Sequence, residues 1–225
     1  MSFPQNFAPK KQGNRNGLLC TLCHSATLPL INYRNAWYFK CPTCHGIFMD
    51  PVSFPSLNEE KERYLTHNND PTQEGYQQFV MPIVDRILRD YSTEHLGLDY
   101  GAGKSEIITY MLTEQKYQVA AYDPIFKNTN YLLQRGYHYV ACCEVVEHFH
   151  DPAKEFKRLY NLLVSKGKLY IKTDLYVGSI NFQKWYYKDD PTHTFFYSER
   201  TMQWIKERYG FKDLNIDGRL VILSK

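Results

Sequence analysis

A glycine turn between two apolar segments constrains the fold of this chain more than any other feature. Residues 96–100 form an apolar, strand-like segment, and Gly101 and Gly103 follow it directly. The next stretch carries apolar residues at helical spacing, and 117–122 has the pattern of a second strand that ends at Asp123. A strand, a glycine turn, a helix and a second strand in this order predict the opening βαβ unit of a nucleotide-binding parallel sheet.

Three kinds of nucleotide site use a glycine turn at this place. A P-loop needs a glycine five positions before Gly103, but Leu98 stands there. A dinucleotide site needs a third glycine, and the chain has Glu106 instead. A site for S-adenosylmethionine fits best, because Asp99 precedes the turn and the carboxylate of Asp123 is placed to accept both ribose hydroxyls. Glycines in such a turn let the backbone approach the cofactor closely.

The segment after the third strand favours the last of these hypotheses. The strand expected over 137–143 runs into Glu-Val-Val-Glu-His at 144–148, and Asp151, Pro152 and a helical stretch follow. Together with the Asp-x-Gly-x-Gly turn, these residues resemble class I S-adenosylmethionine-dependent methyltransferases over 96–225. The whole chain resembles uncharacterised bacterial-type methyltransferases with an N-terminal zinc ribbon, for which the resemblance implies an activity class but no substrate.

The implied fold is α/β, a Rossmann-like class I methyltransferase sheet with a C-terminal antiparallel hairpin, joined to a small N-terminal zinc ribbon. Asp217 and Gly218 give the hairpin signal between two apolar segments. Too few residues separate Asp123 from Tyr137 for the extra helix and strand of a full domain. We therefore expect a shortened sheet with a stub helix over 128–136, and what brackets the adenine instead stays open.

The resemblance places the cofactor at the carboxyl ends of the first strands. The residues expected to bind it are Asp99, Tyr100, Gly101, Gly103, Asp123, Pro124, Cys143 and Glu144. Cys142 and Cys143 are interpreted as buried strand residues. Neither is expected to be a nucleophile, because the proline that precedes the reactive cysteine of cytosine-C5 DNA methyltransferases is absent.

The methyl acceptor is expected at the same edge of the sheet. An aromatic insertion over 174–197, which carries a single histidine, lies where methyltransferases of this class hold their substrate. His193 in this insertion and His148 after the third strand are the candidate general bases, since histidine titrates near neutrality. Trp185 and Tyr186 are candidate substrate contacts. The alternative for these residues is that they only shape the loop and the pocket wall.

Four cysteines in two Cys-x-x-Cys pairs predict a metal site near the N-terminus. Cys20 and Cys23 are separated from Cys41 and Cys44 by 17 residues, a spacing typical of structural zinc with four thiolate ligands. The segment between the pairs is rich in strand formers and predicts a hairpin. So short a segment cannot build its own core, so a metal would supply the missing stability. Such a ribbon either anchors the N-terminus onto the main domain or docks the substrate.

The expected organisation has four parts: a disordered tail (1–17), the zinc ribbon (18–50), a helical connector (51–95) and the methyltransferase domain (96–225). Hydrophobic residues make up 43% of the chain, which excludes disorder as its main state. No apolar stretch is long enough for a membrane span, and the tail lacks the apolar core of a secretory signal. We therefore expect a cytoplasmic protein without a membrane partner.

The sequence predicts methyl transfer from S-adenosylmethionine to an acceptor, with a small molecule favoured. The net charge of +3 gives little support to nucleic-acid binding, so an RNA methyltransferase that docks RNA on its ribbon is the alternative. A non-catalytic binding module with the same fold is a further alternative, and the complete glycine turn with its flanking aspartates speaks against it. The methylated atom and the oligomeric state stay open.

Overall fold

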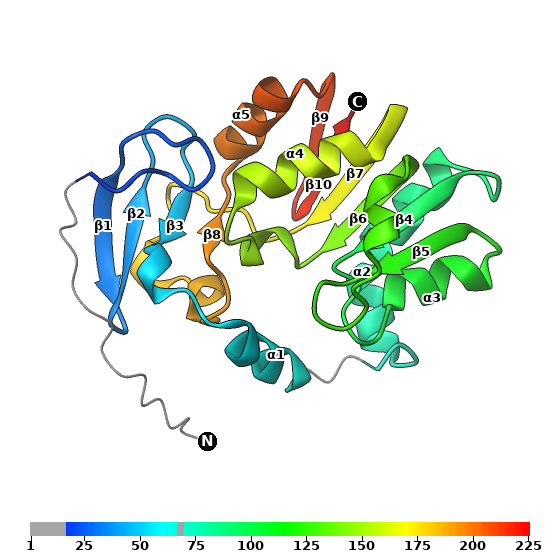
Figure 1. The fold of residues 1–225 in the computed structure, drawn as a ribbon, viewed down its shortest axis with the longest axis horizontal. Helices are drawn as coiled ribbons and strands as arrows, with labels where there is room; N and C mark the ends of the chain where they lie inside the picture. Colours follow the sequence, from blue (N-terminus) through cyan, green and yellow to red (C-terminus); the bar gives the residue numbers. More distant parts are fainter. Residues whose placement is uncertain (1–16, 67–69) are drawn as a thin grey trace.

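The computed structural model describes residues 17–66 and 70–225, which form two sheets joined by helices (Figure 1). Apart from Gly17, the tail expected over 1–17 lies outside the described residues. In the described part of the chain, no helix combines the length and the apolar character needed to cross a membrane.

The larger sheet has six strands in the order β5-β4-β6-β7-β10-β9. They are β4 (Leu96–Tyr100), β5 (Gln118–Tyr122), β6 (Tyr137–Cys143), β7 (Leu163–Lys172), β9 (Asp213–Asp217) and β10 (Leu220–Ser224). The first four in this order pair in parallel, and β10 runs antiparallel to β7 and β9. A single 3-10 turn, Asn130–Gln134, stands between β5 and β6. The predicted shortened sheet with an antiparallel hairpin is confirmed.

Helices cover both faces of this sheet (Figure 1). They are α2 (Glu74–Asp90), α3 (Ile107–Glu114), α4 (Pro152–Leu162) and α5 (Glu199–Tyr209). α2 and α3 share one core with Tyr139 and Tyr170 of the strands, and α4 and α5 share the other with Leu98. The side chains of Asp151 and Ser198 cap α4 and α5 by accepting from free backbone N–H groups of the first turn.

The N-terminal residues form a second, antiparallel sheet in the order β1-β2-β3-β8. Its strands are β1 (Leu28–Tyr33), β2 (Ala36–Lys40), β3 (Ile47–Met49) and β8 (Phe195–Phe196). β8 comes from the aromatic insertion, far along the chain, and pairs Phe195 with Phe48 of β3. Phe39, Phe48 and Phe195 belong to the same core as the α4 face of the larger sheet. The ribbon and the main sheet therefore share one core.

Helix α1 (Leu57–Leu65) lies below the junction of the two sheets (Figure 1). Its N-cap is Ser56, whose side chain accepts from the N–H of Glu59 while the Glu59 carboxylate accepts from the N–H of Ser56 at 2.7 Å. Arg63 forms an ion pair with Asp190 of the insertion at 2.8 Å. The helix thus forms one wall of the space between the sheets. Further 3-10 helices are η1 (Pro51–Ser53), η3 (Val146–His148), η4 (Phe182–Lys184) and η5 (Tyr186–Asp189).

Candidate active site and metal centre

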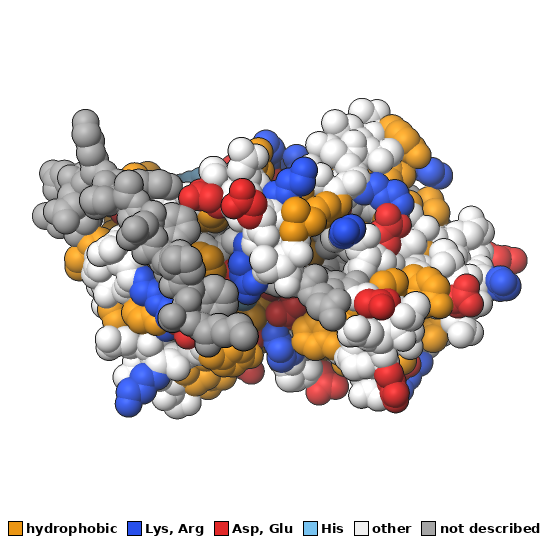
Figure 2. Space-filling view, turned by 90° about the horizontal axis from the view of Figure 1, so that it is seen from below, with side chains coloured by type: hydrophobic (Ala, Val, Ile, Leu, Met, Phe, Trp, Pro, Cys, Tyr) orange, Lys and Arg blue, Asp and Glu red, His pale blue; other side chains and the backbone are white. Residues whose placement is uncertain are grey.

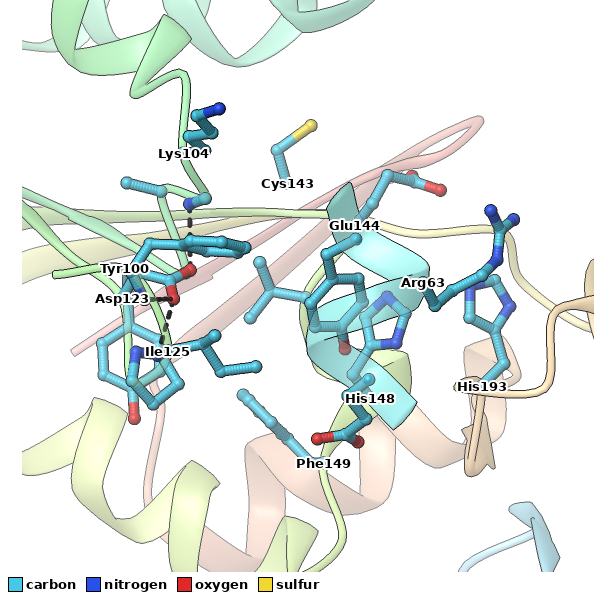
Figure 3. Close-up of a pocket in the computed structure, with 18 of the residues that line it drawn as sticks. Arg63, Tyr100, Lys104, Asp123, Ile125, Cys143, Glu144, His148, Phe149 and His193 are labelled. Atoms are coloured by element: carbon cyan, nitrogen blue, oxygen red, sulfur yellow. Dashed lines mark hydrogen bonds between the residues drawn. The ribbon is translucent and has the colours of Figure 1, made fainter. Parts of the chain in front are cut away.

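A cavity of about 1270 Å³ lies at the carboxyl ends of β4, β5 and β6. Its walls are the glycine turn after β4, the loop after β5, the segment after β6, helix α1 and the aromatic insertion. Figure 3 shows Tyr100 and Asp123 on one side of this space, Glu144 and His193 on the other, and His148 between them. The cavity therefore joins the residues expected at the cofactor to those expected at the acceptor.

The glycine turn wraps around the carboxylate of Asp123, which is only 7% exposed. One carboxylate oxygen accepts from the N–H of Gly103 at 2.9 Å, and the other accepts from the N–H groups of Ile125 and Phe126 at 2.8 and 2.9 Å. Gly101 and Gly103 have φ values of 80° and 64°, which favour glycine. A carboxylate offers about four acceptor directions, and the three backbone N–H groups use three of them, so Asp123 keeps capacity for one ribose hydroxyl.

Asp99, another predicted cofactor residue, is buried and does not line the cavity. One of its oxygens accepts from the N–H and the hydroxyl of Thr109 in α3, at 3.2 and 3.0 Å. Burial raises the pKa of Asp99 to about 7. The carboxyl group holds α3 against β4 and does not face the space where a ligand would lie.

We expect Asp99→Asn to change how stability depends on pH. The folded pKa is about 7, whereas an unfolded aspartate titrates near about 3.9. As the pH rises between these values, the unfolded state loses a proton that the folded state keeps, so the free energy of unfolding falls in this window and is level above it. The variant has no carboxyl group to titrate. Between these two pH values its free energy of unfolding should therefore rise relative to that of wild type by at most about 4 kcal/mol. Urea unfolding at about pH 4 and about pH 7.5 measures the gain, and a pH-independent difference would contradict the raised pKa.

The other residues predicted at the cofactor beyond the turn and Asp123 line the cavity: Tyr100, Pro124, Cys143 and Glu144. The hydroxyl of Tyr100 donates to Glu155 and accepts from Arg158 at 3.1 Å, which fixes the ring at the cavity wall. Burial raises the pKa of the Cys143 thiol, as it does for Cys142. Protonated thiols are poor nucleophiles, so these cysteines act as packing groups.

Glu144 and Glu147 form an acidic pair on the far side of the cavity. The hydroxyl of Tyr187 is 2.5 Å from a carboxylate oxygen of Glu147 and 3.2 Å from one of Glu144. Arg219 lies 2.8 Å from both oxygens of Glu144, and the hydroxyl of Thr173 donates to Glu147 at 3.1 Å. Burial raises the pKa of each carboxyl group to about 7. The buried surroundings therefore disfavour the ionised form of both carboxyl groups.

His148 and His193, the two candidate bases, lie beside this pair with ring centroids 4.8 Å apart. Nδ1 of His148 lies 3.0 Å from the carbonyl of Thr192, and Nδ1 of His193 lies 2.6 Å from the carbonyl of Tyr187. Burial lowers the pKa of both rings, that of His193 to about 3. Segments far apart in the sequence thus place two neutral imidazoles at one wall of the cavity.

Of the two predicted substrate contacts, Tyr186 lines the cavity and Trp185 does not. The hydroxyl of Tyr186 donates to Asp174 at 2.7 Å. Trp185 is only 5% exposed and packs against Phe182 and Phe196 in an aromatic cluster that the insertion forms with the ribbon. Tyr186 and Tyr187 both line the cavity, so Trp185 alone of these three adjacent aromatics lies outside it.

Two parts of the site are missing from the sequence-based prediction. Glu147 is fully buried at the centre of the polar cluster, and the Glu-x-x-Glu-His pattern alone could have indicated a role in the site. Glu60 and Arg63 of α1 also line the cavity, and Glu60 lies 2.9 Å from Nε2 of His150. A capping box predicts that α1 forms, but it carries no information about where the helix docks.

The N-terminal cysteines converge on one point. One sulfur atom from each lies within 4.8 Å of the others: Cys20, Cys23, Cys41 and Cys44. Two of the sulfur–sulfur distances are 3.5 and 3.3 Å, against about 3.8 Å for a tetrahedral zinc site with bonds of about 2.3 Å. His24 and His45, which end the two knuckles, adopt φ values of 58° and 61° and turn the chain back on itself. The set fits the four-thiolate site of a small zinc ribbon.

The fold and the cavity together define a class I S-adenosylmethionine-dependent methyltransferase. The methyltransferase-domain family matches residues 72–216, which is more than half of the chain. The chain therefore belongs to this family. A search of curated proteins found no match.

Solved methyltransferases share the fold at low sequence identity. The 1,6-didemethyltoxoflavin-N1-methyltransferase of Burkholderia thailandensis matches with a TM-score of 0.52 and 12% identity, over 88% of this chain and 98% of that one. Phosphoethanolamine N-methyltransferase 2 of Haemonchus contortus matches with a TM-score of 0.52 and 18% identity, over 69% and 42%. A methyltransferase of Archaeoglobus fulgidus matches with 0.50 and 17%, over 66% and 97%. Other matched proteins are longer, and the chain spans 55% of PigF. At these identities the likeness is one of fold.

Proposed function

We propose that this protein transfers a methyl group from S-adenosylmethionine to a small-molecule acceptor. The observation that carries the proposal is that one continuous cavity runs from Gly101, Gly103 and Asp123 to His148 and His193. S-adenosylmethionine supplies the electrophilic methyl group when it is bound. The chain contributes binding, alignment of the acceptor and exclusion of water. Asp123 and the glycine turn hold the donor, and the histidine pair faces the acceptor.

The size and surroundings of the cavity support a small acceptor. Its volume of about 1270 Å³ exceeds the roughly 300–1,000 Å³ of a pocket for one drug-sized ligand, so it has room for the donor and a second molecule. Arg63 and Asp190 pair across it from α1 to the insertion. RNA would need a basic surface, whereas Figure 2 shows positive and negative side chains interspersed on the face seen from below.

The acceptors of the structural neighbours point the same way. The Burkholderia thailandensis enzyme was solved with 1,6-didemethyltoxoflavin and S-adenosylhomocysteine, and the Haemonchus contortus enzyme with phosphomonomethylethanolamine and S-adenosylhomocysteine. Both acceptors are small molecules. The two differ in chemistry, so they support the size class of the acceptor and no particular compound.

Activation of the acceptor is the role proposed for His148 and His193. A carbonyl oxygen can only accept, so Nδ1 of each ring is the donor in its bond to the backbone. Nε2 of each neutral ring then carries the free electron pair that a proton or another electrophile requires. Both rings line the cavity, where this pair can act on the methyl-accepting group.

We expect His148→Ala to lower kcat at least about 100-fold, because acid–base assistance contributes about 10²–10⁴-fold. The affinity for S-adenosylhomocysteine should stay unchanged, since the glycine turn and Asp123 are untouched. His95→Gln is the matched control, because His95 stands at the amino end of β4, away from the cavity. Transfer of radioactive methyl groups to fractions of a bacterial extract is the assay, with small molecules and RNA separated. Label that enters only RNA would overturn the small-molecule assignment.

The second part of the proposal is a zinc ion in the four-cysteine cluster. Thiolates at tetrahedral spacing select zinc over hard cations. The role of this ion is structural, because β3 of the ribbon pairs with β8, which directly follows His193 and Thr194. A rigid ribbon thereby fixes the end of the insertion that carries His193.

A further inference from the structure

We propose a divalent cation site at the acceptor end of the cavity, with Glu147, His148 and His193 as its protein ligands. One ligand atom from each of these residues lies within 4.8 Å of the others. The segments that carry them are tied together, because the N–H of Thr194 donates to the carbonyl of Glu147 at 2.8 Å. The site is separate from the four cysteines and has a different donor chemistry.

The hydrogen bonds of the two imidazoles already have the pattern of metal ligands. Nδ1 of His148 and Nδ1 of His193 each donate to a backbone carbonyl, those of Thr192 and Tyr187. This is the outer interaction that fixes the tautomer and the ring orientation of a metal-binding histidine. The two ring centroids are 4.8 Å apart, and one nitrogen from each ring lies within 4.8 Å of the other and of a Glu147 oxygen.

The carboxylate of Glu147 supplies the charge that a cation would neutralise. Glu147 is fully buried, and its oxygens accept from the neutral hydroxyls of Tyr187 and Thr173. The nearby arginines are engaged elsewhere, Arg219 with Glu144 and Arg63 with Asp190. Within the described ranges, no lysine or arginine forms an ion pair with Glu147. A buried carboxylate without a cationic partner is costly, and a bound cation removes that cost.

The ligand set indicates the class of metal. Two imidazoles and one carboxylate suit manganese, iron, cobalt or zinc, whereas magnesium and calcium prefer oxygen ligands alone. His148 and His193 line the cavity and Glu147 lies behind them. The coordination positions left open by the protein therefore face the space of the acceptor.

A cation at the acceptor end of the cavity also suggests how the acceptor is activated, and this step rests on the proposed methyltransferase function. In this refinement the two histidines act on the acceptor through the cation, because their free electron pairs bind it and no longer accept a proton. The cation would bind an acceptor hydroxyl and lower its pKa, so that the proton is released to water. An electron pair of the acceptor oxygen then forms the bond to the methyl carbon as the carbon–sulfur bond breaks. The electron pair of that bond stays on sulfur, and S-adenosylhomocysteine leaves. The acceptor class is thus a small molecule with a hydroxyl group.

Binding of Mn²⁺ to the zinc-loaded protein tests the site without any assay of activity. Free Mn²⁺ gives an electron paramagnetic resonance signal that is lost on binding, so a titration counts bound ions. We expect one Mn²⁺ per chain in addition to zinc. Glu147→Gln and His193→Gln should each weaken the affinity at least about 10-fold. His150→Gln is the matched control, because His150 lines the same cavity outside the cluster.

Wild type without bound Mn²⁺, or ligand variants that bind it as tightly as wild type, would overturn the cation site. Titration of the same samples with S-adenosylhomocysteine reports on the donor site and on correct folding of the variants. Failure of wild type to bind S-adenosylhomocysteine would overturn the proposed function and leave the Mn²⁺ result standing. The two ideas therefore fail separately.

Discussion

Asp123→Ala is expected to remove most of the affinity for S-adenosylhomocysteine, at least about 10-fold. The buried carboxylate links the turn at Gly103 to the loop at Ile125 and Phe126 by bonds of 2.8 to 2.9 Å. It is also the acceptor proposed for a ribose hydroxyl. A hydrogen bond to a charged group contributes about 1.5–3 kcal/mol, so the lost hydroxyl contact alone corresponds to a factor of about 10 to 100. Isothermal titration with S-adenosylhomocysteine measures the loss.

Two further variants separate a lost contact from a misfolded loop. Asp217→Ala removes an exposed carboxylate from the β9–β10 hairpin, on the other edge of the sheet, and should bind the ligand as wild type does. Asp123→Asn keeps an oxygen for the amides of Ile125 and Phe126 but turns an NH₂ group toward the N–H of Gly103, so its affinity should be intermediate. A folded Asp123→Ala protein that binds with wild-type affinity would rule out this cofactor site.

The main sheet was predictable because its signals are local. The strand at Leu96–Tyr100, the glycine turn and the acidic end of β5 lie within thirty residues of one another. Each signal there reflects a backbone requirement, such as the positive φ of Gly101 and Gly103. The shortened sheet followed from the short segment between Asp123 and Tyr137, which has too few residues for a further helix and strand.

The acceptor side was predictable only in part, because its geometry depends on distant segments. His148 and His193 were both candidates, yet their meeting depends on bonds between the insertion and the segment after β6, such as that from the N–H of Thr194 to the carbonyl of Glu147. The insertion is held in turn by β8, a strand of two residues that pairs with β3. So short a strand has no detectable period, and its partner lies far away in the sequence. Docking of α1 over the cavity through Arg63 depends in the same way on Asp190. Burial separated Trp185 from Tyr186, which composition could not do.

Loss of zinc is the other large expected effect, and Cys44→Ser is the variant that produces it. Cys44 is fully buried, and its sulfur lies 3.5 Å from that of Cys20. Zinc binding accounts for about 10–16 kcal/mol in small zinc peptides, and part of it should be lost here. We expect at least about 3 kcal/mol of lost stability, or roughly 6–12 °C in Tm for a chain of this size. Calorimetry and metal analysis of the same sample measure both losses.

The same variant tests whether the ribbon only stabilises the fold or also supports the active site. Pairing of Phe48 with Phe195 connects the ribbon to the strand that follows His193. Disorder of the ribbon should therefore lower kcat even at temperatures where the main sheet is folded. Cys143→Ser is the matched control for zinc content, because Cys143 lies outside the four-cysteine cluster. Lost zinc and a lower Tm with unchanged kcat would limit the ribbon to stability, whereas retained zinc would show that these cysteines are not its ligands.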